Sequence, residues 1–101
     1  MIRNAYLRKV GERLERMDEE IDRLRTTAEA ASAEAKFLYG RQRKNLLSKA
    51  EEARRRIEAV RNGGAASWGT LKKGTEDALD ELRKAVDDAV REIRKTGSNE
   101  R

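Results

Sequence analysis

The residues best suited to chemistry in this chain are basic ones near its middle. Residues 36–61 hold nine lysines and arginines and only three acidic side chains, Glu51, Glu52 and Glu58. Cationic side chains neutralise phosphate groups, and this attraction is independent of nucleotide sequence. We call residues 36–61 the basic belt, and its charge predicts weak, sequence-independent binding of nucleic acid or of an anionic membrane surface. The candidate contacts are Arg41, Arg43, Lys44, Arg54, Arg55 and Arg56.

A second interpretation treats the basic belt as an ordinary solvated surface. Its basic positions scatter around a helix axis instead of sharing one face, and runs of charge on helices usually serve only to solvate them. Phe37 and Tyr39 lie beside these charges, where an aromatic ring could stack on a base. A tyrosine among charges more often has its ring at the edge of a helix packing surface and its hydroxyl in water. The sequence leaves both interpretations open.

Catalytic chemistry has little support in the sequence. The chain contains no histidine and no cysteine, which excludes imidazole bases, thiol nucleophiles and the usual zinc ligands. Adjacent carboxylates such as Glu19 and Glu20 are explained by a charged helix surface with ion pairs one turn apart, for example Glu12 with Arg16. A core only one helix stripe thick cannot enclose a pocket. We therefore expect no enzyme activity, no cofactor, no metal ion and no small-molecule substrate.

The elements that must position the basic belt are helices. From Leu7 to Leu38, apolar residues recur three or four positions apart without a gap, which is the heptad pattern of packed helices. The chain also lacks proline, which would interrupt a helix. The pattern continues to Val60 and predicts one helix over residues 4–61, about 85 Å long at 1.5 Å per residue. The alternative is a three-helix bundle in which this helix is broken near Gly40.

Turn residues then separate this helix from a second one. Asn62-Gly63-Gly64 is typical of a helix end, and predicts a turn over residues 62–66. Ser67 is a suitable N-cap, and apolar residues at heptad-like spacing predict a helix over residues 67–95, with a frayed tail over residues 96–101. The prediction is an all-α protein with a single helical domain over residues 1–101. Its architecture is a long antiparallel helical hairpin, one long helix and one shorter helix, with coiled-coil packing.

The unequal lengths of the two predicted helices predict self-association. The shorter helix covers only the half of the long helix nearest the turn, so the apolar stripe of the other half would face water. An exposed stripe of large apolar side chains is an interaction surface. We therefore expect an antiparallel homodimer with a four-helix region, or a protein partner on the same stripe. The expected oligomer interface is Leu7, Val10, Leu14, Met17, Ile21 and Leu24.

No segment of the chain has the character of a targeting signal or of a membrane span. Residues 1–20 mix basic and acidic side chains and lack the apolar run of a signal peptide. Nothing approaches the ~20 consecutive apolar residues that a membrane-spanning helix needs. We expect a soluble, cytoplasmic protein.

The residues from Trp68 to Leu82 form a recognisable pattern, W-x-x-L-K-x-G-x-x-x-A-x-x-x-L. With this segment and the long charged helix before it, the chain resembles small bacterial coiled-coil proteins that are often labelled hypothetical or stress-response proteins. The resemblance implies a coiled-coil fold and no catalytic residue or cofactor. The chain as a whole predicts a non-enzymatic coiled-coil interaction or scaffold protein, to which the family label adds a link to stress, and polyanion binding through the basic belt is the alternative. The matching positions are Trp68, Leu71, Lys72, Gly74, Ala78 and Leu82.

Overall fold

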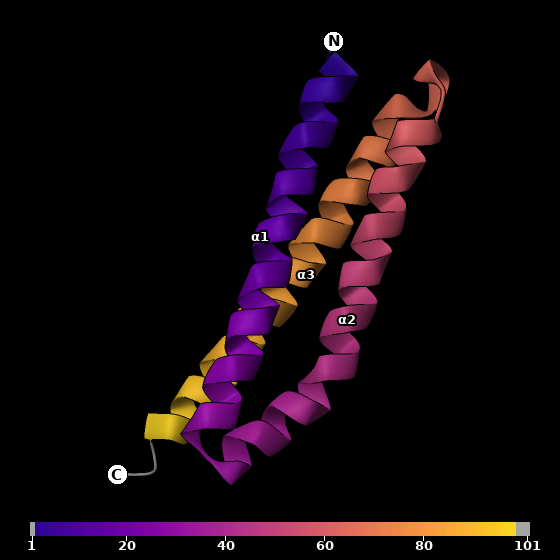
Figure 1. Cartoon of the computed structure of the whole chain (residues 1–101). Helices are drawn as coiled ribbons and strands as arrows, with labels where there is room; N and C mark the ends of the chain where they lie inside the picture. The colour runs from indigo at the N-terminus through magenta and orange to yellow at the C-terminus, as the bar shows by residue number, and fades with distance from the viewer. Residues whose placement is uncertain (1, 99–101) are drawn as a thin grey trace.

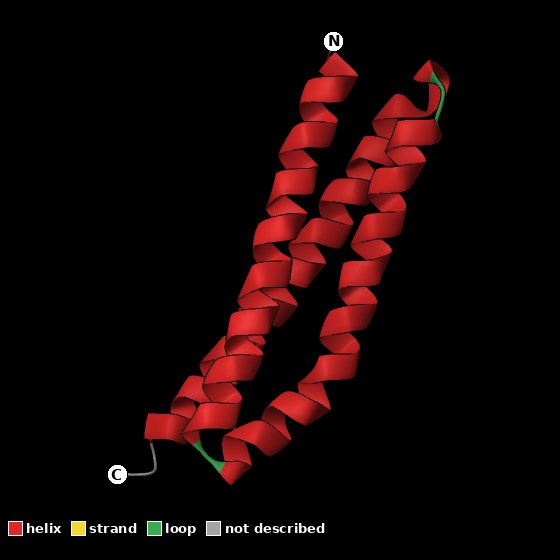
Figure 2. Ribbon diagram, viewed as in Figure 1, coloured by secondary structure: helices red, strands yellow, loops and turns green. Residues whose placement is uncertain are grey.

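Three helices of nearly equal length form the fold, in a computed structural model that describes residues 2–98. α1 spans Ile2–Ala31, α2 spans Ala33–Asn62 and α3 spans Trp68–Ser98, with a short 3-10 turn, η1, at Ala65–Ser67. Successive helices run antiparallel, so the chain travels along the bundle three times (Figure 1). The described residues contain helices and short connections but no strand (Figure 2), which confirms the predicted all-α class. The Cα trace measures 55 × 19 × 15 Å.

The single long helix predicted over residues 4–61 is wrong, because the chain leaves helical geometry at Ser32. Ser32 has extended backbone angles, φ −165° and ψ 166°, and its Oγ accepts a hydrogen bond from the backbone N–H of Ala35 at 3.0 Å. The hydroxyl thereby satisfies one of the donors that the first turn of a helix leaves free. Gly40, the break point of the alternative prediction, lies inside α2. The chain is thus a three-helix bundle instead of a two-helix hairpin, with its break at Ser32.

The connection between α2 and α3 lies where the sequence predicts it. α2 ends at Asn62, and Gly63 and Gly64 lead into η1. A Cβ on Gly63 would lie 2.3 Å from Leu71 Cδ1 and 2.9 Å from the Ala59 carbonyl oxygen, so a side chain at this position would displace Leu71 and strain the backbone at the end of α2. α3 runs to Ser98, which makes residues 96–98 of the predicted tail helical. The rest of that tail, residues 99–101, lies outside the described residues.

One continuous apolar core runs between the three helices. Most of the residues expected at an oligomer interface belong to it, because the turn at Ser32 folds α1 back so that α2 and α3 cover its stripe. This corrects the predicted interface: the stripe is not bare. The unequal lengths behind that prediction are also absent, since the helices have 30, 30 and 31 residues. Leu7 packs at the edge of the core, and the α1 residues that are at most 7% exposed include Val10, Leu14, Met17, Ile21 and Leu24.

Charged side chains link the helices along the surface. Arg83 of α3 donates two hydrogen bonds to the Glu20 carboxylate of α1, at 2.6 and 2.9 Å. These bonds hold the pKa of Glu20 below its usual value. Arg13 of α1 pairs with Asp80 of α3 at 2.8 Å. Exposed and half-exposed ion pairs contribute little to stability, so the apolar core supplies the stability and the ion pairs align α1 on α3.

Aromatic rings close the end of the bundle where α1 and α3 begin. The rings of Tyr6 and Trp68 meet edge to face with centroids 5.3 Å apart. The Tyr6 hydroxyl lies 3.2 Å from both the Lys72 carbonyl and a Glu76 carboxylate oxygen. Burial, together with the Glu76 charge, raises the pKa of Tyr6 to about 12. This cluster anchors the first turns of α1 to the first turns of α3.

None of the helices within residues 2–98 combines enough length with enough apolar character to cross a membrane.

Candidate functional site

The basic belt divides into two parts that differ in their acidic neighbours. Between Glu34 and Glu51, residues 35–50 of α2 contain five basic side chains and no acidic one. Within residues 2–98, four of them, Lys36, Arg41, Arg43 and Lys44, are exposed and form no ion pair. The fifth, Lys49, is half-buried and lines a groove between α2 and α3 together with Glu52 and Glu81.

Two large apolar side chains lie among these unpaired charges. Phe37 is 64% exposed and Leu47 is 43% exposed, although most apolar residues of α2 are buried. Phe37, Arg41 and Lys44 follow one another at spacings of four and three residues and so form one row on the helix surface. Lys36, Arg43 and Leu47 belong to the adjacent row, which Gly40 completes. We call these six side chains the basic face: Lys36, Phe37, Arg41, Arg43, Lys44 and Leu47.

The fold presents the basic face to solvent because the opposite side of α2 belongs to the core. Tyr39, Leu46 and Ala50 are at most 6% exposed and pack into the bundle. Burial raises the pKa of Tyr39, and its ring is not available to stack on a ligand. The first turns of α2 also lie at an angle to the rest of the helix, toward the end of the bundle that holds Ser32 (Figure 1). The six side chains therefore sit on an outward-facing, convex surface.

The part of the belt nearer the connection to α3 has its charges paired within the chain. Arg54 reaches Glu51 at 3.0 Å and Asp18 of α1 at 3.1 Å. Arg55 and Arg56 both bind the Glu52 carboxylate, at 2.7 and 2.8 Å. Their hydrogen bonds lower the pKa of Glu52 and keep it ionised. We call residues 51–61, where Arg61 pairs with Glu58 at 3.1 Å, the paired segment.

The candidate contacts predicted from the sequence thus fall into two groups. Arg41, Arg43 and Lys44 lie together on the basic face, whereas Arg54, Arg55 and Arg56 belong to the paired segment. Sequence reasoning omitted Lys36, Phe37 and Leu47 from the candidate contacts. The sequence could have indicated Lys36, because residues 35–50 contain no acidic side chain that could pair with it on the same helix. The exposure of Phe37 and Leu47 follows only from how α2 packs.

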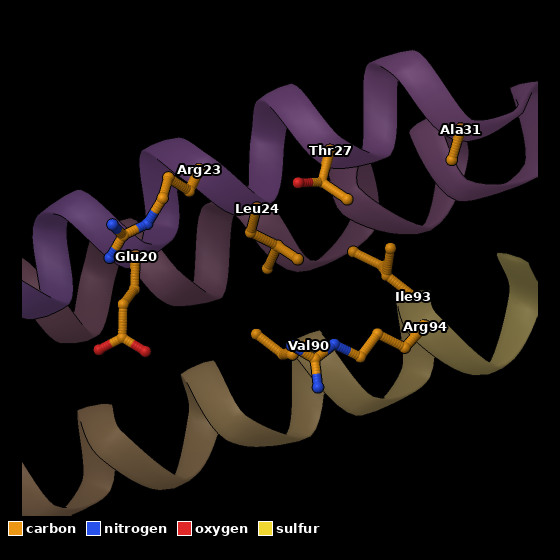
Figure 3. A pocket seen from close by; sticks show the side chains of 8 residues that line it. All are labelled: Glu20, Arg23, Leu24, Thr27, Ala31, Val90, Ile93 and Arg94. Atoms are coloured by element: carbon orange, nitrogen blue, oxygen red, sulfur yellow. The ribbon is translucent and has the colours of Figure 1, made fainter.

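An open groove of about 440 Å³ lies between α1 and α3 near the Ser32 end. Figure 3 shows Leu24, Thr27 and Ala31 on one side of it and Val90 and Ile93 on the other. Most of these side chains are apolar, and the Glu20 carboxylate at the groove's edge is engaged by Arg83. Across residues 2–98, no group of three or more His, Cys, Asp or Glu side chains is placed to hold a metal ion. The basic face differs from this groove in combining four exposed, unpaired cations with two exposed apolar side chains on one helix.

The chain was compared with known proteins in three ways. No protein-family model, curated protein sequence or solved structure matches it. The resemblance to small bacterial coiled-coil proteins therefore stays a prediction, and the candidate site rests on the geometry of α2 alone.

Proposed function

We propose that this chain is a non-enzymatic helical module that binds anionic surfaces through the basic face of α2. The observation that carries the proposal is an exposed helix face with four cations and no acidic side chain to pair with them. Each neutralised phosphate releases condensed counterions, which favours binding at low salt. At a lipid surface, each lysine or arginine contributes about 1 kcal/mol. Four such residues are enough for measurable, salt-sensitive binding.

The proposal places the alternative prediction, anionic binding, ahead of the interaction or scaffold role. The expected self-association, or a protein partner on the same stripe, depended on exposure of residues 7–24, and the core of the bundle covers most of that stripe. An interaction role now has its support in α2, where large apolar side chains remain exposed beside unpaired charge. A cytoplasmic location, where nucleic acids and anionic lipid headgroups are both accessible, stays part of the proposal.

Two double variants test the proposal at matched charge. Arg41→Gln with Lys44→Gln removes two charges from the basic face, and Arg55→Gln with Arg61→Gln removes two from the paired segment. Binding to anionic vesicles and to duplex DNA is measured at ~50 mM salt, where screening is weak. We expect the first variant to weaken binding by about tenfold or more and the second by less than about twofold. For DNA, four contacts predict a log–log salt slope of about −3 to −4.

Two results would contradict the proposed function. One is the absence of binding to both anionic probes at ~50 mM salt. The other is an equal loss of binding in the two variants, because binding would then depend on net charge and not on the basic face. Circular dichroism of each variant controls for loss of helix.

A further inference from the structure

We infer that the anionic surface recognised by the basic face is a lipid membrane, with Phe37 and Leu47 entering its headgroup layer. This inference rests on the proposed function and names the ligand class. Phosphate neutralisation alone would need only the cations of α2. The two exposed apolar side chains among them favour a ligand that also offers an apolar environment.

The chemistry of the two apolar residues favours lipid over nucleic acid. A phenylalanine can stack on a base, but an aliphatic leucine supplies no such stacking. Phe37 and Leu47 are ten positions apart, which is about 15 Å along the helix axis at 1.5 Å per residue. Both are compatible with one nearly flat lipid surface, into which each inserts separately. Helices that lie in the membrane interface combine these features, a cationic face with bulky apolar side chains.

The shape of the basic face points to the same ligand. It is the outer surface of a helix and therefore convex, so it has no groove to hold a single strand. Arg41 and Lys44 lie between Phe37 and Leu47 along the axis, at the level where lipid phosphates would meet them. In contact with a membrane, their long aliphatic stems would lie along apolar surface while the charged ends stay hydrated. The remaining cations, Lys36 and Arg43, flank the same contact.

The deciding experiment changes the apolar residues and leaves every charge in place. Phe37→Ala with Leu47→Ala is compared with Ile2→Ala, because Ile2 is 80% exposed and lies outside the basic face. Binding is measured on phosphatidylcholine vesicles with and without phosphatidylglycerol, and on duplex DNA. We expect the double variant to bind the anionic vesicles about tenfold more weakly, as for loss of about 1.4 kcal/mol of apolar burial. DNA binding should stay unchanged, and Ile2→Ala should bind vesicles like the original chain.

The outcomes separate this inference from the proposed function. Unchanged vesicle binding in Phe37→Ala/Leu47→Ala, with a loss in Arg41→Gln/Lys44→Gln, overturns membrane insertion and leaves anionic binding intact. An equal loss on DNA and on vesicles overturns the inference too, because it indicates contact with bases. Loss of binding in Ile2→Ala would show that apolar exposure anywhere promotes association, and would likewise overturn it. Failure of the original chain to bind either anionic probe removes the proposed function itself.

A separate observation at Ser32 carries a second proposal, about a second copy of this chain. We propose that α1 can be exchanged between two copies by straightening the chain at Ser32. One residue alone separates two helices of 30 residues each. Alanines surround it at positions 28, 30, 31, 33 and 35, with neither glycine nor proline among residues 26–36. Alanine is the best helix former, so this segment readily continues a helix.

The exchanged form would reuse the contacts of the closed bundle. If Ser32 took helical backbone angles, α1 and α2 would join into one helix, and the α1 stripe would leave the core of its own chain. The same core surface of a second copy would receive it, and the reverse exchange would complete a two-fold dimer. Such domain swapping needs no new interface, since only the hinge differs between the two forms. The serine cap is the local interaction that favours the closed form.

Two changes at the hinge test the exchange in opposite directions. Ser32→Ala removes the cap from both chains and should raise the dimerisation constant about 30-fold in analytical ultracentrifugation. Two glycines inserted after Ser32 should relax the turn and shift the chain to monomer. Spin labels at residues 19 and 55, diluted with unlabelled protein, should move to about 54 Å apart in the dimer. A dimer with unchanged label distances, or no rise in dimerisation for Ser32→Ala, would overturn this proposal.

Discussion

The two halves of α2 carry similar numbers of basic residues, but they differ in whether those residues are paired with carboxylates, which a count of charges does not reveal. In the paired segment, Arg54, Arg55, Arg56 and Arg61 each have a carboxylate within 3.1 Å. On the basic face, the cations are exposed and unpaired within residues 2–98. Both stretches add to the net charge of +5. Within α2, it is therefore the basic face that presents unpaired charge to a partner.

The two halves also differ in how closely they are tied to α3. Near the paired segment, the buried Thr75 hydroxyl lies 2.9 Å from the Leu71 carbonyl and 3.2 Å from the Arg56 carbonyl of α2. Gly63 allows Leu71 to approach closely at the same end. Near the basic face, α2 and α3 are linked by a 3.3 Å hydrogen bond between the exposed side chains of Gln42 and Glu92. The buried hydrogen bond between α2 and α3 therefore lies in the half with the paired segment, and the exposed, unpaired cations lie in the other half.

The largest expected effect is at Gly63. Gly63→Ala places a methyl group 2.3 Å from Leu71 Cδ1 and 2.9 Å from the Ala59 carbonyl oxygen. We expect it to destabilise the bundle by about 2 kcal/mol in urea unfolding, as overpacking does. Gly64→Ala is the control, because Gly64 has similar extended backbone angles and nothing within 4 Å of its added Cβ. Equal effects of the two variants would refute close packing at this end.

A smaller effect is expected at Thr75. Thr75→Val keeps the shape of the side chain and removes the hydroxyl that joins α3 to the Arg56 carbonyl. The expected loss is about 1 kcal/mol, the net contribution of one buried hydrogen bond. Thr26→Val is the matched change, because Thr26 donates only to the carbonyl one turn earlier in its own helix and is exposed. If the free energy of unfolding falls by the same amount in both variants, the hydrogen bond from Thr75 to α2 does not contribute to stability.

The smallest effect, and one of opposite sign, is expected at Gly40 beside the basic face. Gly40→Ala meets no atom within 4 Å and replaces glycine by the best helix former. We expect a gain of about 0.5–1 kcal/mol in the free energy of unfolding. Gly11→Ala in α1 is the comparator, since its added Cβ also meets nothing. A gain at Gly11 with none at Gly40 would mean that the angled first part of α2 depends on glycine.

Much of the candidate site was accessible from the sequence, and the missing part depends on packing. The excess of basic residues and the acid-free stretch from residue 35 to residue 50 are properties of composition. The pairs of Arg55 and Arg56 with Glu52 follow from spacings of three and four residues on one helix. The pair between Arg54 and Asp18 crosses from α2 to α1 and required the folded chain. The exposure of Phe37 and Leu47 depends on the rotation of α2 against its neighbours.

The sequence by itself determined the helical class, the turn after Asn62 and the start of α3. These features depend on local preferences: heptad spacing, the absence of proline, and an Asn-Gly-Gly helix stop. The break at Ser32 was decided by tertiary structure, because the heptad phase passes through the surrounding alanines without a change. Locally, a cap of about 1 kcal/mol opposes the strong helix preference of alanine. Burial of each large apolar side chain of α1 stabilises by about 1.5–3 kcal/mol, and within a single chain that gain requires α1 to fold back on α2 and α3.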